Sequence, residues 1–472
     1  MGWRPGAGAA GRLPARERFG FAVGDFGLNL YWQGIGLFLI YYQTDVLGLP
    51  AWWAGAVFFL ASLWDALANP VMGLVADRTR TRWGRFRPYV LLGSLPLAAS
   101  FALAFSAPGL GGGALVAYAL AAQLLLRTAY TVVAIPYAAL SASMTRDSAE
   151  RTALTGLRMQ FAFLGGVAVA YLFPFLVPRL GDGDPRQGYL LAACLLGLLG
   201  VASAVLCFAL AREGEGEAGR PAPAGLLAEA RGFLGIARRS GPLLRLLGGL
   251  VLVSVFVSLH TASLAYVLKY VLGAWQAAEW ALPLVAAVNA AAALLWVPVL
   301  QRRGKPAGWR LSAGVTILFG LALFLAPPLP LLPSLLLVAG VAVGSTGFGV
   351  CFWSMLPDTV EYNQWRFGRR DEATTVGLAC FAQKLSLGLS AALMGLVLEA
   401  GGFVPNAEQG PAALASIRAL AGLLPAVGAA LSLLLLRRYP LDARRHRTLV
   451  RALARRDARP GPSCGTRGAG PG

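Results

Sequence analysis

Charged side chains are scarce in this sequence, and their scarcity argues against a water-soluble fold. They make up 13% of the 472 residues, against about 25% in a typical soluble domain, while 57% of the residues are hydrophobic. A compact soluble domain of this size cannot bury nearly all of its side chains, so lipid is the more suitable solvent. We therefore expect an integral membrane protein.

Residues for metal binding and covalent catalysis are also few. There are only two histidines, His260 and His446, and five cysteines, of which four lie in apolar stretches and one in the C-terminal tail (Cys194, Cys207, Cys351, Cys380 and Cys464). Their spacing is typical of neither a disulfide framework nor a metal site. The sequence has no nucleophile–base set and no Gly-Lys-Ser/Thr phosphate loop. We predict no enzymatic activity, no cofactor, no resident metal and no use of ATP by this chain.

What the sequence does contain is a series of long apolar stretches. A helix needs about 20 residues to cross roughly 30 Å of hydrocarbon, and it must be a helix because lipid offers the backbone no hydrogen bonds. We expect twelve spans, at residues 21–42, 51–76, 89–107, 114–143, 157–180, 189–211, 244–270, 280–300, 311–329, 332–356, 374–400 and 414–436. The fold class is therefore an all-α membrane protein with twelve transmembrane helices.

The positive charge is unevenly placed between these spans. Of 41 Lys and Arg residues, 35 lie in the N-terminus, the tail and alternate connections, at residues 77–88, 144–158, 212–245, 301–310 and 358–372. Cytoplasmic loops carry this excess, so we predict that both termini are cytoplasmic and that the chain crosses the inner (plasma) membrane. The net charge of +19 then reflects topology, and we expect no nucleic-acid partner.

The centre of the chain has a different composition. Residues 212–242 are rich in Gly, Pro and charge, which is typical of a flexible linker. We predict a cytoplasmic N-terminus (1–18), a six-helix bundle (19–211), a cytoplasmic linker (212–242), a second six-helix bundle (243–436) and a basic cytoplasmic tail (437–472). Basic loops recur about 224 residues apart, which indicates pseudo-symmetric bundles with a site between them.

A few polar residues interrupt the spans, and such residues usually face a cavity. They are Asp25 with Asn29, Asp65 with Asn69, Arg127 with Thr131, and the single residues Arg158, Lys269 and Lys384. Each pair is four residues apart and so shares a helical face. A buried carboxylate can bind a proton or Na⁺, and a buried lysine can neutralise it between transport events.

Two of these residues have simpler interpretations. We interpret Lys269, near a span end, as a side chain that extends to the membrane interface. Asp25 could serve the site or could pair with Arg16 or Arg18. Charges in the basic loops could likewise form ion pairs that close the cytoplasmic side, or could be topology determinants only; the candidates are Asp77, Arg85, Arg151, Asp358, Glu361 and Arg370.

Several motifs carry a resemblance to a known family. The stretches are 24–29 (GDFGLN), 41–49 (YYQTDVLGL), 64–73 (WDALANPVMG), 77–88 (DRTRTRWGRFRP), 358–362 (DTVEY) and Lys384. Together they resemble the glycoside–pentoside–hexuronide:cation symporters of the major facilitator superfamily, of which the melibiose carrier is a member. The resemblance implies sugar transport driven by Na⁺ or H⁺, with Asp65 and Thr131 at the cation site. It also implies functional charges at Arg158 and Lys384 and inner-gate charges at Arg151, Asp358, Glu361 and Arg370.

The sequence also departs from the melibiose-carrier pattern. Ala68–Asn69 replaces an Asn–Asp pair, and Asn29 and Ala134 replace the two sugar-binding carboxylates. With one cation-site carboxylate left, H⁺ coupling through Asp65, or facilitated transport without coupling, is favoured over Na⁺ coupling, although a Na⁺ ion at Asp65 remains an alternative. Arg127 is an added cation, from which we hypothesise an anionic substrate such as a hexuronide.

We therefore predict a sugar-class symporter that acts as a monomer. The cation-coupling residues are Asp65, Asn69 and Thr131, and the substrate-binding residues are Asp25, Asn29, Arg127, Arg158 and Lys384. Two alternatives remain: a carrier of lysophospholipids or other amphiphiles, and a membrane sensor that has lost transport.

Overall fold

The structure is a computed structural model that describes residues 13–145, 148–213, 240–326, 329–367, 372–437, 439–441, 445, 448–449 and 451. The N-terminal half contains α1 (Ala15–Gly34), α2 (Ala51–Arg78), α3 (Arg87–Ala104), α4 (Gly112–Met144), α5 (Ser148–Leu180) and α6 (Pro185–Leu210). π-Helical segments η1 (Ile35–Leu39) and η2 (Tyr42–Val46) extend α1. These elements cover the first six predicted spans.

The C-terminal half contains the other six. They are α8 (Gly241–Tyr266) with the π-helical segment η3 (Val267–Val271), α9 (Ala278–Arg303) after the short η4 (Trp275–Ala277), α10 (Lys305–Leu325), α11 (Leu331–Phe367), α12 (Glu372–Ala400), and a last span of α13 (Pro411–Arg418), η5 (Ala419–Leu423) and α14 (Leu424–Leu436). The all-α prediction is confirmed, and a helix lies at each predicted span, although the span 311–329 includes residues 327–328, which are outside the described part.

Among the described residues, eleven helices are long and apolar enough to cross a membrane. α1 is not among them, because its charged first turns and Asp25, Asn29 and Gln33 lower its hydropathy. Large apolar side chains face outward where lipid would lie; Leu294, for example, is 76% exposed. The chain is thus a multi-pass membrane protein.

Several predicted loops were wrong because helices continue beyond the apolar runs. Residues 148–158 form the first turns of α5, and the predicted loop 358–372 begins with the last turns of α11. Between α9 and α10 a single residue, Gly304, replaces the predicted loop 301–310. Apolar length marks the hydrocarbon layer only, and a helix can run on into the interface. Of the predicted linker 212–242, residues 214–239 lie outside the described part.

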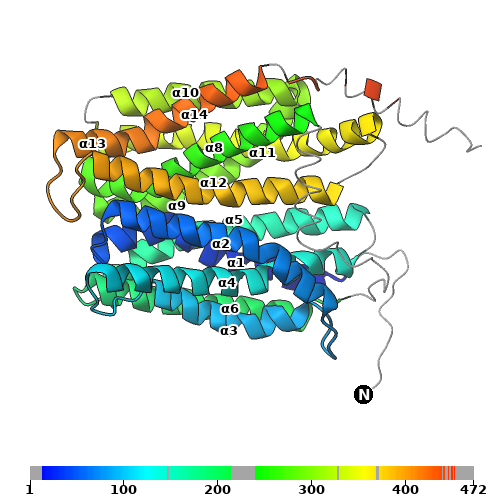
Figure 1. The fold of residues 1–472 in the computed structure, drawn as a ribbon, viewed down its shortest axis with the longest axis horizontal. Coiled ribbons are helices and arrows are strands. Elements are labelled where there is room, and N and C mark those ends of the chain that lie inside the picture. Colours follow the sequence, from blue (N-terminus) through cyan, green and yellow to red (C-terminus); the bar gives the residue numbers. More distant parts are fainter. Residues whose placement is uncertain are drawn as a thin grey trace, which may run out of the picture.

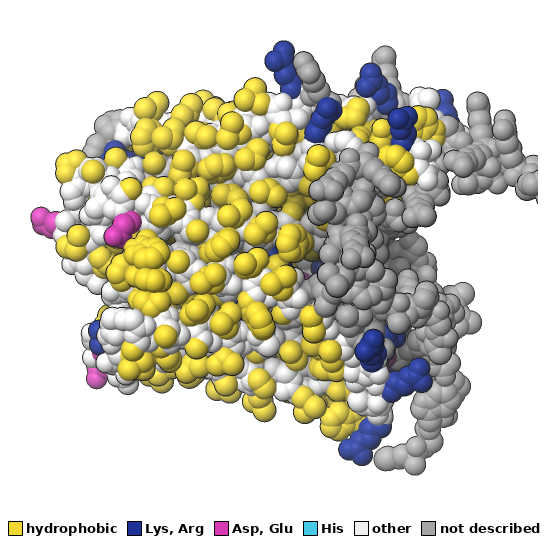
Figure 2. All heavy atoms as spheres, viewed as in Figure 1, with side chains coloured by type: hydrophobic (Ala, Val, Ile, Leu, Met, Phe, Trp, Pro, Cys, Tyr) yellow, Lys and Arg dark blue, Asp and Glu magenta, His cyan; other side chains and the backbone are white. Residues whose placement is uncertain are grey.

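The two halves lie side by side, with α1–α6 below and α8–α14 above in Figure 1. α2 packs along α12, and α5 packs along α9, so these two pairs join the halves. Gly55 of α2 lies so close to α12 that a Cβ there would sit 2.5 Å from the Ala391 carbonyl oxygen. Figure 2 shows hydrophobic side chains over most of one face and Lys and Arg gathered toward one end, which we call the basic end.

At the opposite end, the two halves share a turn of the same construction. Residues 41–49 (YYQTDVLGL) and 266–274 (YVLKYVLGA) are related by a shift of 225 residues. In each, the helix ends in a π-helical turn and a glycine with positive φ, Gly48 at 73° and Gly273 at 59°. The closing hydrogen bonds also correspond, Leu47 N to Tyr42 O at 3.0 Å and Leu272 N to Val267 O at 2.9 Å. This local repeat supports an internal duplication.

Candidate functional site

Asp65 lies at the centre of a hydrogen-bonded group on α2 and α4. Asp65 and Asn69 are one turn apart on α2, so both face α4. The Thr131 hydroxyl donates to Asp65 Oδ1 at 2.7 Å and lies 3.2 Å from Asn69 Oδ1. The structure thus brings together all three predicted cation-coupling residues, although their role in coupling stays a prediction.

Lys384 of α12 completes this group from the other half. Its Nζ lies 2.9 Å from Asp65 Oδ2, with Asp65 1% and Lys384 19% exposed. Each carboxylate oxygen therefore has its own donor, a hydroxyl on one side and an ammonium on the other. A charge inside the membrane is costly without a counter-charge, so each residue stabilises the other.

Arg127 lies one turn from Thr131 on α4, and it is 1% exposed. Its guanidinium carbon is 4.9 Å from the ring centre of Phe58 and 5.5 Å from that of Trp32, so two aromatic faces contact the charge. Its Nη2 is buried without a hydrogen-bond partner. Within the described part of the chain, no carboxylate lies within ion-pair distance of Arg127, whereas Arg158 and Lys384 each have one.

The remaining predicted site residues meet between α1 and α5. Arg158 Nε lies 3.6 Å from Asp25 Oδ2. Asn29 donates from Nδ2 to the Asp25 carbonyl oxygen at 2.9 Å, so its amide is turned toward its own helix. Arg18 instead pairs with Glu150 at 2.7 Å. The alternative in which Asp25 pairs with Arg18 is therefore wrong in this structure.

A second group of polar residues joins the halves at the end opposite the basic end. Lys269 Nζ lies 2.7 Å from Asp45 Oδ1 and 2.6 Å from Asn406 Oδ1. Tyr270 also donates to Asp45, and Thr44 and Tyr266 share a hydrogen bond of 2.7 Å. The interpretation of Lys269 as a side chain that extends to the interface is wrong, because a carboxylate from the other half holds it. Our sequence reasoning did not select Asp45, although it lies within one of the recognised motifs.

The predicted gate residues are only partly described. Asp358 lies in α11, and both its oxygens accept from Lys305 Nζ of the same half, at 2.7 and 2.8 Å. Glu361 lies one turn further along α11. Arg85 Nε donates to the Ala76 carbonyl oxygen at 3.4 Å. The side chains of Asp77 and Arg151, and all of Arg370, lie outside the described residues.

Glu213, at the start of the linker, is a further contact that the sequence did not reveal. Its carboxylate accepts hydrogen bonds from the backbone N–H groups of Arg85, Phe86 and Arg87, at 2.6, 2.7 and 2.7 Å. The first N–H groups of a helix have no partner within the helix, and the helix dipole favours an anion there. Glu213 thus ties the end of α6 to the start of α3.

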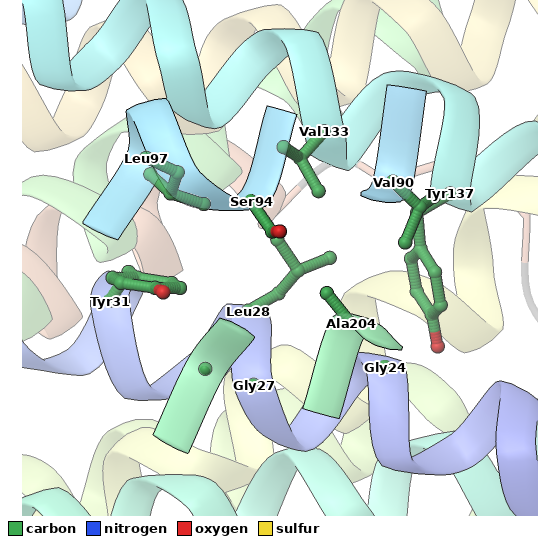
Figure 3. Close-up of a pocket in the computed structure, with 11 residues that line it drawn as sticks. Gly24, Gly27, Leu28, Tyr31, Val90, Ser94, Leu97, Val133, Tyr137 and Ala204 are labelled. Carbon is green, nitrogen blue, oxygen red and sulfur yellow. The ribbon is translucent and has the colours of Figure 1, made fainter. Parts of the chain in front are cut away.

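A small cavity lies inside the N-terminal half, apart from these charges. Figure 3 shows it between α1, α3, α4 and α6, with Ser94 and Tyr137 among mostly apolar or glycine neighbours. Its volume of about 10 Å³ is close to the space of one water molecule. It is a packing defect between helices and too small for a sugar.

Comparison with known sequences gives matches over almost the whole chain. The sequence profile described as MFS/sugar transport protein matches residues 20–443. The uncharacterized symporter YnaJ of Bacillus subtilis (strain 168) is 32% identical over 451 residues, covering 93% of this chain and 95% of that protein. The inner membrane symporter YicJ and the glucuronide carrier protein homolog, both of Escherichia coli (strain K12), are each 28% identical, over 94% and 93% of this chain and 95% of each relative.

Solved structures show the same fold. A bacterial homolog of the human lysosomal transporter Spinster superposes with a TM-score of 0.67, at 14% identity, over 93% of this chain and 98% of that chain. The D-xylose-proton symporter gives 0.64 at 14% identity, over 88% and 96%. At such identities the likeness establishes the fold alone.

Proposed function

The chain belongs to the MFS/sugar transport protein family, and on that basis we propose that it is a symporter that carries a sugar, glycoside or hexuronide across the inner membrane together with a cation. Membership of this family makes the chain a transporter rather than an enzyme. Several relatives are symporters by name, and one is a homolog of a glucuronide carrier. We further propose that the basic end faces the cytoplasm, and that the chain works as a monomer because one chain contains both halves.

The observation that carries the proposal is the buried group of Asp65, Thr131 and Lys384 between the halves. A buried carboxylate that bridges two moving bodies is suited to couple ion binding to their movement. When Asp65 accepts a proton, its attraction for Lys384 disappears and the two halves lose their central ion pair. The proton then moves with the conformational change and is released when Lys384 pairs with Asp65 again.

H⁺ suits this site better than Na⁺. Na⁺ needs several oxygen ligands, yet both Asp65 oxygens already have donors, Thr131 and Lys384. Arg127, one turn from Thr131 on α4, adds a second buried positive charge to this group. A proton needs only one lone pair, whereas Na⁺ would have to displace the lysine and approach the arginine.

The test is transport by the purified protein in liposomes. Uptake of labelled glycosides and hexuronides is measured under an imposed H⁺ gradient and then under a Na⁺ gradient. We expect accumulation driven by H⁺, and its loss in Asp65→Asn. Glu408→Gln, which removes an exposed carboxylate, is the matched control and should transport normally.

Two results would contradict the proposal. Accumulation that depends on Na⁺ and survives in Asp65→Asn would remove Asp65 from coupling. No uptake of any sugar under either gradient would instead support an amphiphile carrier or a sensor, which labelled lysophospholipids can then separate.

A further inference from the structure

Among the described residues, the polar side-chain contacts between the halves are concentrated at one end of the molecule, whereas the apolar packing of α2 on α12 and of α5 on α9 runs along the helices. Apart from Asp65–Lys384, the polar side-chain contacts shown between α1–α6 and α8–α14 lie at the end opposite the basic end. Asp45 takes part in most of them. This end is closed in the described state, and the contacts that close it have a common centre.

That centre lies where the repeated turns of the two halves meet. Tyr41 and its equivalent in the repeat, Tyr266, contact each other with ring centres 5.5 Å apart. Asp45 and its equivalent, Tyr270, are hydrogen bonded. Equivalent residues touch only at a symmetry axis, so the pseudo-two-fold axis passes through this contact. A tilt of one half away from this axis would separate the two turns, and the reverse tilt would bring them together.

The carboxylate of Asp45 is the acceptor on which this contact depends. Its side chain is 0% exposed, and it accepts from Lys269, Tyr270 and its neighbour Thr44. Thr44 and Tyr270 are neutral, so Lys269 is the counter-charge. Among the described residues, no second carboxylate lies within ion-pair distance of Lys269.

Asn406, in the loop after α12, forms hydrogen bonds to both members of the Asp45–Lys269 pair. Its Nδ2 donates to the Asp45 carbonyl oxygen at 2.5 Å, its Oδ1 accepts from Lys269, and its backbone N–H donates to the Tyr270 oxygen at 2.9 Å. Helix α12, which precedes the loop that contains Asn406, also carries Lys384. The contact at the end of the molecule and the ion pair at its centre are therefore attached to one helix.

We propose that Asp45 and Lys269 form a latch that holds the transporter closed at the end opposite the basic end, and that transport requires this ion pair to break and re-form. The proposal deepens the proposed function, since it assigns a role in alternating access to residues outside the substrate site. Loss of Lys269 leaves the Asp45 carboxylate buried without its counter-charge, and loss of Asp45 leaves Lys269, which is 23% exposed, without its carboxylate; both changes destabilise the closed state. In the open state the remaining charge is hydrated, so the equilibrium must shift toward opening.

The test measures the opening directly and needs no substrate. In a background without native cysteines, spin labels are placed at two exposed positions on this end, Leu110→Cys in the N-terminal half and Val404→Cys in the C-terminal half. Distances between them are measured by pulsed electron resonance. We expect Asp45→Asn and Lys269→Gln each to raise the ratio of long to short distances at least about tenfold. Asp45→Asn/Lys269→Gln, with no charge left unpaired, should return toward the wild-type ratio.

The control is the other ion pair that joins the halves at this end, Arg179–Glu279. Its residues are 50% and 34% exposed, and water already solvates both charges. Glu279→Gln should therefore leave the distances unchanged. Unchanged distances in Lys269→Gln, which keeps the Thr44 and Tyr270 hydrogen bonds to Asp45, would overturn the latch. Because the readout is a distance, this result stands apart from any failure of sugar uptake.

Discussion

Asp65 and Lys384 come from different halves of the molecule, and yet their side chains form a buried ion pair of 2.9 Å. The second ion pair between the halves with a fully buried carboxylate, Asp45–Lys269, repeats this division: the acid belongs to the N-terminal half and the lysine to the C-terminal half. The halves therefore attract each other at two places, the centre of the molecule and the end opposite the basic end. Any signal that neutralises one of the acids changes how strongly they associate.

The first prediction concerns the stability of the central pair. Lys384→Met leaves the Asp65 carboxylate buried without its counter-charge, and loss of one partner of a buried pair costs about 3–5 kcal/mol. We expect a clear fall in the melting temperature of the detergent-solubilised protein, measured by the fluorescence of thermal unfolding. Asp65→Asn/Lys384→Met should regain most of the loss. If the effects of Asp65→Asn and Lys384→Met on the melting temperature simply add in the double variant, the ion pair contributes nothing to stability.

The second prediction concerns Arg127 and the charge of the substrate. Among the described residues, two carboxylates, Asp25 and Asp65, face three cations at the site, and Arg127 is the cation without a carboxylate at ion-pair distance. If the substrate is an anion, its carboxylate supplies the missing charge. We expect Arg127→Gln to raise the KM for methyl glucuronide by at least about tenfold, as loss of a charge-assisted hydrogen bond does. The KM for the neutral methyl glucoside should change little, and equal effects on both sugars would rule out this role.

The third prediction concerns the close packing of α2 on α12. A Cβ at Gly55 would lie 2.5 Å from the Ala391 carbonyl oxygen, while one at Gly73 of the same helix meets no atom within 4 Å. Gly55→Ala should therefore force the helices apart and lower both the melting temperature and the uptake rate. Gly73→Ala should be neutral or stabilising, since alanine favours a helix by about 1 kcal/mol over glycine. The opposite order of the two variants would contradict the packing described.

The fourth prediction concerns the linker contact at the start of α3. Glu213→Ala removes the acceptor for the N–H groups of Arg85, Phe86 and Arg87. We expect a loss of about 1–3 kcal/mol, seen as a lower melting temperature. Glu408→Ala, at an exposed site in another loop, should have no such effect. A melting temperature unchanged by both substitutions would mean that water replaces the carboxylate without cost.

The spans could be predicted from the sequence because the membrane imposes a local rule. Any stretch of about 20 apolar residues is expected to be a helix whatever its neighbours are. The same rule fails at the helix ends, where Asp358 and Glu150 lie in continuous helices that the apolar pattern does not mark. Asp65, Thr131 and Lys384 could be selected as a candidate site because polar residues at the membrane centre are costly and few.

Partners could not be predicted, because pairing depends on how distant segments approach each other. Lys269 lies near a span end, where an interfacial position is the simpler interpretation, and its partner lies 224 residues earlier in the chain. Asp45 likewise lies at the end of a span, where a carboxylate is normally solvated. Glu213 contacts residues 126 to 128 positions away. A sequence alone gives no sign of these approaches.

The repeated turns also bear on how this protein arose. If a half-length ancestor paired with its own copy, symmetry would place two identical tyrosines together at the axis, as Tyr41 and Tyr266 are now. The same symmetry would oppose like with like at the neighbouring positions, so an acid there would face an acid. In this chain Asp45 is opposite Tyr270 instead, and Lys269 stands where the N-terminal half has Thr44. Both differences require the two halves to have different sequences. The present arrangement, with one Asp45–Lys269 pair and a tyrosine opposite the acid, is therefore one that two identical halves could not form.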